Sequence, residues 1–144
     1  MFCGEYQHNF DQKGRVIMPA RFREGLQDKF MATRGTDGCI YAFSLEEFEK
    51  RVTKLLSTEE DYEDKEVARQ RHFLGSAREC EFDSQGRAMI PSNLREWAKI
   101  KKQVTIIGIG TRIEIWDFDN YEAYKNKEES QPSHFNKKQD EVKP

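Results

Sequence analysis

The chain has 144 residues and a mass of 17.0 kDa, which fits one domain or two very small ones. Hydrophobic residues make up 36% and charged residues 35%, and no apolar stretch reaches the roughly 20 residues that span a bilayer. The first residues lack the basic and apolar regions of a signal peptide, and Cys3, Cys39 and Cys80 form no Cys-x-x-Cys pair. We therefore expect a cytoplasmic protein whose cysteines are small packing residues, without a disulfide framework or zinc site.

The net charge of −2 is unevenly distributed along the chain. Segments 1–34 and 67–105 carry net charges of +2 and +4, whereas segments 35–66 and 106–144 carry −6 and −2. The local field, and not the net charge, governs contact with a polyanion. Two basic segments within an acidic chain are therefore compatible with nucleic-acid binding.

The chain contains an internal repeat with an offset of 72 residues. Residues 10–24 align with residues 82–96 and are identical at seven of the 15 positions, where chance would give about one. With a shift of one residue, the similarity continues between 40–43 and 113–116. Half of the chain is a diverged copy of the other half.

Each copy predicts the same order of elements, β-β-α-β-β. An extended segment enters a tight Asp-x-x-Gly-Arg turn, in which aspartate suits the first position and glycine the fourth. Between flanking apolar residues, this pattern is typical of a β-hairpin. The returning strand stops at Pro19 or Pro91, which suits the first turn of a short helix. A second strand pair follows each helix, at 30–34 with 39–43 and at 103–109 with 112–116.

A single copy is too small to bury a core of its own. We therefore expect an α+β, mainly β fold in which two half-domains, 1–50 and 77–124, close together into one barrel. Segment 51–76 is predicted as a helical connector. Segment 125–144 has few apolar residues and is predicted as a flexible, frayed tail.

Two helices are predicted around the connector. Ser44 and Glu47 have capping-box spacing at the start of the first helix. Thr58 begins the second, and the acidic run at 59–64, interrupted only by Tyr62, suits a helix N-terminus. We interpret this acidic run as a solvated helix start and not as a metal site.

Catalytic and metal-binding patterns are not found in the sequence. The three histidines, His8, His72 and His134, are scattered in dissimilar contexts. The segment from Gly108 to Gly110 lacks the third glycine of a dinucleotide-binding fingerprint and lies between predicted strands, so it is predicted to be a hairpin turn. We therefore predict no enzyme activity, no metal, no cofactor, no small-molecule substrate and no membrane partner.

The two Asp-x-x-Gly-Arg turns are the strongest functional candidates. The spacing of four places the acid and the arginine opposite each other. This ion pair either only fixes the strand register or also orients a guanidinium that points outward, toward a guanine edge or a phosphate. The lysine at the first tip suits a phosphate. The candidates are Arg15, Arg87 and Lys13 for DNA contact, and Asp11, Gly14, Asp83 and Gly86 for support of the loops.

Several of these segments closely resemble the bacterial MraZ family. They are residues 4–15 with 19–23, then 34–39, 82–91 and 110–116. The motifs agree in order and spacing over roughly residues 1–125. The resemblance implies tandem AbrB-like half-domains of the swapped-hairpin type. It also implies a nucleoid-associated transcriptional regulator that represses its own division and cell-wall gene cluster by binding short, G-rich direct repeats in double-stranded promoter DNA.

The resemblance further implies assembly as a closed homo-oligomeric ring. Head-to-tail subunits present the same surface in the same sense, which favours direct repeats. The family's Asp-x-x-x-Arg signature maps onto both turns, with Arg15 and Arg87 as the DNA-contacting members. Gln85 stands where the first turn has Lys13, so we expect the first turn to give more phosphate binding. The alternative is a ring-forming protein-interaction scaffold in which the Asp–Arg pairs are only structural. Its binding would be insensitive to salt.

Overall fold

The computed structural model describes residues 1–57 and 64–131, which form eight strands, five α-helices and one 3-10 turn. In chain order these are β1 (Glu5–Asn9), β2 (Arg15–Ile17), α1 (Ala20–Leu26), β3 (Lys29–Arg34), η1 (Thr36–Gly38), β4 (Ile40–Ser44), α2 (Leu45–Leu56), α3 (Asp64–Gly75), β5 (Arg78–Glu81), β6 (Arg87–Met89), α4 (Ser92–Trp97), β7 (Gln103–Ile109), β8 (Arg112–Asp117) and α5 (Phe118–Glu129). The order β-β-α-β-β predicted for each copy is confirmed.

The strands form an open sheet, which corrects the predicted barrel. Six antiparallel strands run in the order β1-β7-β8-β4-β3-β5, and β2 pairs with β6 in a separate two-stranded sheet. Strands β1 and β5 are therefore the two edges of the large sheet, and the sheet does not close on itself. The mixed α+β class and the tandem repeats fit the prediction, but the swapped-hairpin barrel is not confirmed.

The two halves exchange strands instead of folding separately. Strand β1 of the first copy pairs with β7 of the second, and β5 of the second pairs with β3 of the first. The hairpins predicted between β1 and β2 and between β5 and β6 are therefore formed only next to their turns. The Asp11 N–H donates to the Arg15 carbonyl at 2.8 Å and the Asp83 N–H to the Arg87 carbonyl at 2.9 Å. Beyond these bonds and one bridge from Phe82 to Ala88, the predicted pairing is wrong. Each first strand finds a longer partner in the other copy than the three-residue strand that follows it.

Strands β2 and β6 lie on a local pseudo-two-fold axis. Val16 pairs with Ala88, its own equivalent at the offset of 72 residues. The neighbouring pairs, Arg15 with Met89 and Ile17 with Arg87, exchange places under the same rotation. We call this two-stranded sheet the central ribbon.

The main core lies between the large sheet, the central ribbon and helices α1 and α4. It contains the buried helix residues Phe22, Leu26 and Leu94. A second, aromatic cluster joins α2 and α3 to the sheet. Its buried members include Phe43 and Phe73, and the ring of Phe48 stacks on Phe73 with a centroid distance of 5.4 Å.

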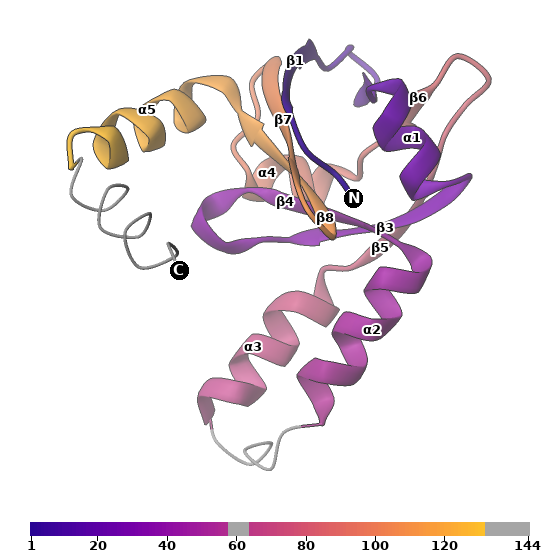
Figure 1. Cartoon of the computed structure of the whole chain (residues 1–144), viewed down its shortest axis with the longest axis vertical. Coiled ribbons are helices and arrows are strands. Elements are labelled where there is room, and N and C mark those ends of the chain that lie inside the picture. The colour runs from indigo at the N-terminus through magenta and orange to yellow at the C-terminus, as the bar shows by residue number, and fades with distance from the viewer. Residues whose placement is uncertain (58–63, 132–144) are drawn as a thin grey trace, which may run out of the picture.

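Helices α2 and α3 lie side by side and project from the sheet as an arm (Figure 1). The predicted cap of α2 is confirmed, because the Glu47 N–H donates to Ser44 Oγ at 3.1 Å. The predicted helix start at Thr58 and most of the acidic run fall outside the described residues. No helix within 1–57 and 64–131 is long and apolar enough to cross a membrane.

Helix α5 occupies the place in the second copy that α2 occupies in the first. Asp117 caps it by accepting a hydrogen bond from the Asn120 N–H at 3.1 Å. The helix runs to Glu129 and so enters the segment predicted as a frayed tail. Tyr124 packs on Trp116 at 5.1 Å, and Lys125 pairs with Glu122 at 3.1 Å. These contacts extend the helix where composition alone indicated disorder.

Candidate nucleic-acid interface

The first Asp-x-x-Gly-Arg segment forms the predicted tight turn. Asp11 Oδ1 accepts hydrogen bonds from the backbone N–H groups of Lys13 and Arg15, both at 2.9 Å. The Gly14 N–H donates to the Asp11 carbonyl at 3.1 Å, which closes the turn. Gly14 has φ +78°, a left-handed conformation that glycine adopts without the cost a side chain would add.

The second turn repeats this geometry. Asp83 Oδ1 accepts from the N–H groups of Gln85 and Arg87 at 2.9 Å each, the Gly86 N–H donates to the Asp83 carbonyl at 3.1 Å, and Gly86 has φ +77°. Lys13 and Gln85 contribute only backbone atoms to these bonds. The substitution between the two copies therefore leaves the turn intact and changes only the charge at its tip.

An ion pair bridges each turn, at the position that the sequence spacing predicted. Arg15 Nε donates to Asp11 Oδ2 at 2.7 Å, and Arg87 Nε donates to Asp83 Oδ2 at 2.8 Å. The backbone hydrogen bond from the arginine N–H lowers the pKa of each aspartate, reinforced by the arginine side chain and opposed by desolvation. Both acids are therefore ionised at neutral pH and fix the Nε side of each guanidinium.

The opposite edge of each guanidinium is available to an external acceptor. The Arg15 and Arg87 side chains are 25% and 26% exposed. In the part of the chain that the structure describes, their Nη atoms donate no hydrogen bond to protein. A guanidinium fixed at Nε presents two further donors in one plane, which suits a guanine edge or a phosphate.

The central ribbon brings both arginines onto one face. Val16 and Ala88 point inward and are buried, so the alternate residues of β2 and β6 face outward. Arg15 and Arg87 are diagonal neighbours on that outer face, where such positions lie about 7–8 Å apart. The other two outward residues are apolar and half exposed, Ile17 at 48% and Met89 at 52%.

Two further arginines hold the turns in place, and they were not predicted from the sequence. Arg95 Nε donates to the Ile90 carbonyl at 2.9 Å, and its guanidinium covers Gly14 of the other copy so closely that a Cβ there would lie 2.8 Å from Arg95 Cζ. Arg23 covers Gly86 in the same way. The signal was present in the repeat, because positions 23 and 95 are among its seven identities.

Backbone contacts complete this exchange between the copies. The Ile90 N–H donates to the Gly14 carbonyl at 3.1 Å, and the Met18 N–H donates to the Gly86 carbonyl at 3.3 Å. Each turn is therefore held by a backbone hydrogen bond and by a helix arginine of the other copy. The two turns and the ribbon between them form one pre-organised surface.

The other candidate features of the sequence are the histidines and the glycines near residue 110. No group of three metal-ligating side chains occurs within the described residues. His72 packs edge-on against Trp97 at 5.1 Å, His8 lies in β1, and His134 lies outside the described residues. The predicted hairpin between β7 and β8 is confirmed, with Gly108 at the end of β7 and Gly110 in the connection between the strands.

The cysteines divide into two groups. Cys39 and Cys80 are buried, as predicted for packing residues, and burial raises the pKa of the Cys80 thiol to about 12. Cys3 is exposed, so the packing role predicted for it is wrong. It precedes Gly4, where the chain approaches β7 through backbone hydrogen bonds and the side chain is left outside.

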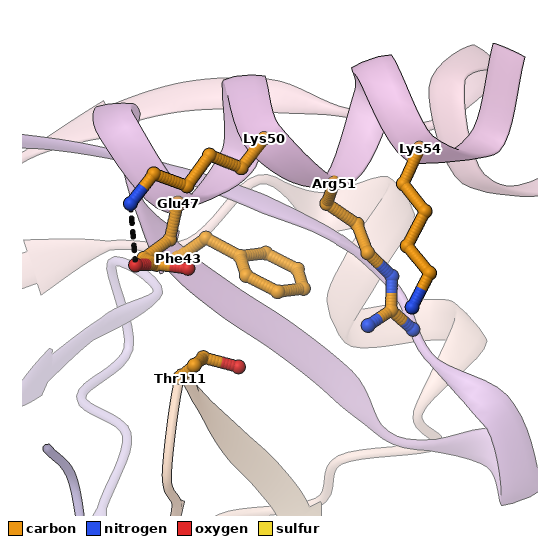
Figure 2. Close-up of a pocket in the computed structure, with 6 residues that line it drawn as sticks. All are labelled: Phe43, Glu47, Lys50, Arg51, Lys54 and Thr111. Atoms are coloured by element: carbon orange, nitrogen blue, oxygen red, sulfur yellow. Dashed lines mark ion pairs between the residues drawn. The ribbon is translucent and has the colours of Figure 1, made fainter. Parts of the chain in front are cut away.

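A small hollow of about 150 Å³ lies beneath α2 (Figure 2). Lys50 pairs with Glu47 at 3.6 Å at one end of it, and Arg51 and Lys54 extend from α2 at the other end. Phe43 and Thr111 form the rest of its lining. This basic patch belongs to the arm and contains no residue of the turns or of the central ribbon.

The interlocked copies and the paired turns define a class, namely a tandem-repeat protein that presents two fixed arginines on a two-stranded ribbon. A family model described as "MraZ protein, putative antitoxin-like" matches the chain twice, at residues 1–71 and 73–143. The chain belongs to the MraZ family. The double match confirms the internal repeat and its offset of 72 residues.

Curated relatives support the same assignment. The chain is 51% identical over 129 residues to the transcriptional regulator MraZ of Acetivibrio thermocellus, with 89% of each chain covered. It is 46% identical over 133 residues to the protein of the same name from Natranaerobius thermophilus, with 90% of each covered. The protein of the same name from Pelotomaculum thermopropionicum is 50% identical over 125 residues, with 87% of this chain and 86% of that one covered.

Proposed function

We propose that this chain is a transcriptional regulator that binds double-stranded DNA through the central ribbon. The observation that carries the proposal is the pair of arginines, each fixed at Nε by an aspartate, on one outward face. The major groove of B-DNA admits a two-stranded β-ribbon. Arg15 and Arg87 are the residues that contact bases, while Asp11 and Asp83 orient them.

Spacing supports contact with two guanines that lie about two base steps apart. Diagonal positions on an antiparallel pair lie about 7–8 Å apart, which corresponds to about two base steps of 3.4 Å. An arginine bonds O6 and N7 of guanine with two donors, and an exposed aliphatic side chain fits the thymine methyl group. Arg15 and Arg87 therefore favour G-rich sites, and Ile17 and Met89 fill the groove between them.

The resemblance to the MraZ family supports a proposal for the target genes, the operator and the assembly. The regulator represses its own division and cell-wall gene cluster, and the operator consists of short G-rich direct repeats upstream of it. Subunits assemble into a closed ring, so several ribbons engage DNA together. Multivalency of this kind raises the affinity of an acidic chain whose single contact surface is small. The same role implies that the protein acts in the cytoplasm at the nucleoid.

The test is binding to the DNA upstream of the chain's own gene, measured by fluorescence anisotropy at two salt concentrations. We expect Arg15→Ala to weaken binding by about 1–3 kcal/mol for each guanine that the arginine binds in the parent complex. Arg51→Ala, which removes an exposed cation from the arm, is the matched control and should bind like the parent. Unchanged binding by a folded Arg15→Ala protein would exclude this mechanism.

The exposed apolar pair on the ribbon also supports the second candidate, a protein-interaction scaffold. Ile17 and Met89 would then pack against another subunit, and the Asp–Arg pairs would be structural only. Replacing both with serine separates the two functions. In the DNA-binding mechanism this double variant keeps its oligomeric state and loses affinity for the operator. In the scaffold mechanism it changes the oligomeric state, and the parent shows no salt-dependent DNA binding.

A further inference from the structure

A segment of the other copy lies beside each turn, and we call it the flank of that turn. The two flanks are equivalent in position but differ in charge. The Phe10 N–H, just before the first turn, donates to the Lys102 carbonyl at 2.8 Å. The Phe82 N–H, just before the second turn, donates to the Asp28 carbonyl at 3.4 Å. Lys102 and Asp28 therefore occupy equivalent places under the pseudo-two-fold rotation. A lysine flanks one turn and an aspartate flanks the other.

The flank of the first turn is an open, cationic hollow. It has a volume of about 540 Å³ and is lined by Asn9, Phe10, Asp11, Gln12, Lys101 and Lys102. Lys101 Nζ pairs with Asp119 at 3.4 Å. Lys102 is exposed and makes no ion pair with any residue in the described ranges, and the same holds for Lys13 at the tip. Within those ranges, two ammonium groups without an ion pair border the first turn.

The flank of the second turn has the opposite character. Asp28 is exposed there, Gln85 replaces the lysine at the tip, and Glu81 and Lys29 oppose each other across β5 and β3. One further cation, Arg21, lies on α1 two positions before the arginine that covers this turn. Even with Arg21 counted, the second flank carries no excess positive charge.

From this difference we infer that Lys102 is a phosphate-binding residue and that, with Lys13, it gives the ribbon a fixed polarity on DNA. The inference rests on the proposed function, because it needs the ribbon to lie in the major groove. The first turn then abuts a phosphate strand through two ammonium groups. The second turn reaches base edges through Arg87 but is kept away from the opposite phosphates by Asp28.

Polarity has a consequence for the arrangement of binding sites. A symmetric ribbon would bind a site equally well in both orientations. A ribbon with one cationic flank distinguishes the two orientations. Subunits related by a rotation around a ring present that flank in one sense, so they select repeats of one orientation.

The first arm of the test measures the dependence of DNA affinity on salt. Each phosphate contact contributes about −0.9 to the slope of log K against log salt, so removing one reduces the affinity drop between 50 and 200 mM salt by about 3.5-fold. We expect this reduction for Lys102→Gln, once for every subunit engaged. Lys54→Gln on the arm is the control and should keep the parental slope.

The second arm compares direct with inverted repeats. Asp28→Lys makes both flanks cationic, and we expect it to bind more tightly than the parent and to lose part of the preference for direct repeats. A parental slope for Lys102→Gln, or weaker binding by Asp28→Lys, would overturn the inference. If Arg15→Ala still loses binding in that case, the proposed function stands without the polarity. If Arg15→Ala also binds DNA like the parent, the proposed function itself is excluded, and the inference with it.

Discussion

Replacing Gly14 with alanine tests whether one copy holds the DNA-binding turn of the other. The glycine has φ +78°, where a side chain costs about 1–2 kcal/mol. The new Cβ would also lie 2.8 Å from Arg95 Cζ, so the guanidinium must move and lose its hydrogen bond to the Ile90 carbonyl at 2.9 Å. A hydrogen bond from a charged donor is worth about 1.5 kcal/mol at the low end. We expect a total loss of about 3 kcal/mol.

Urea denaturation followed by circular dichroism gives the free energy of unfolding for a double-mutant cycle. In an Arg95→Ala background only the backbone cost remains, so Gly14→Ala should cost about 1–2 kcal/mol there. Gly38→Ala is the control for that cost, because Gly38 has φ +77° and its Cβ would meet no atom within 4 Å. Equal losses for Gly14→Ala with and without Arg95 would show that Arg95 does not occupy this space.

Three further predictions address the remaining parts of the molecule. Hydrogen bonds lower the pKa of Asp11 and Asp83 below the ordinary 3.8, so their stabilisation is complete above that value and is lost as pH falls through the lowered pKa. The Asp11→Asn, Asp83→Asn double variant should therefore show a smaller fall in Tm below about pH 4 than the parent. An equally steep fall in Tm for the two proteins would contradict this. Phe43→Ala should destabilise by about 3–5 kcal/mol and expose the arm to proteolysis, and a variant as stable and protease-resistant as the parent would be inconsistent with the aromatic cluster. A thiol reagent should modify Cys3 in the native protein and Cys80 only after unfolding. Mass spectrometry measures the labelling of each cysteine, and labelling of Cys80 in the native protein would contradict its burial.

Local patterns allowed much of the fold to be predicted. The turn chemistry of Asp11 and Gly14 and the cap at Ser44 depend on residues within five positions of one another. Each of these was confirmed. The Asp–Arg pairs were also predictable, since a separation of four residues across a tight turn places the two side chains opposite each other.

Strand partnership was harder to predict, because the two copies are similar and the same ladder can form within or between them. The sequence favoured pairing of β1 with β2, whereas β1 pairs with β7 some 100 residues away. The contact of Arg95 with Gly14 depends on that exchange. The identity of positions 23 and 95 marked both arginines, but only the topology shows that each acts on the turn of the other copy.

Duplication within one chain allows the two halves to differ at equivalent positions, which two identical chains could not do. Both turns keep the residues that set their geometry, because each turn is in contact with the strand end and the helix of the other copy. The flanks are free of that constraint, and Lys102 and Asp28 have diverged at equivalent places. A rigid frame with two-fold symmetry thereby carries an asymmetric charge pattern. The proposed polarity on DNA needs both properties, since symmetry positions the two arginines and asymmetry decides which way the ribbon faces.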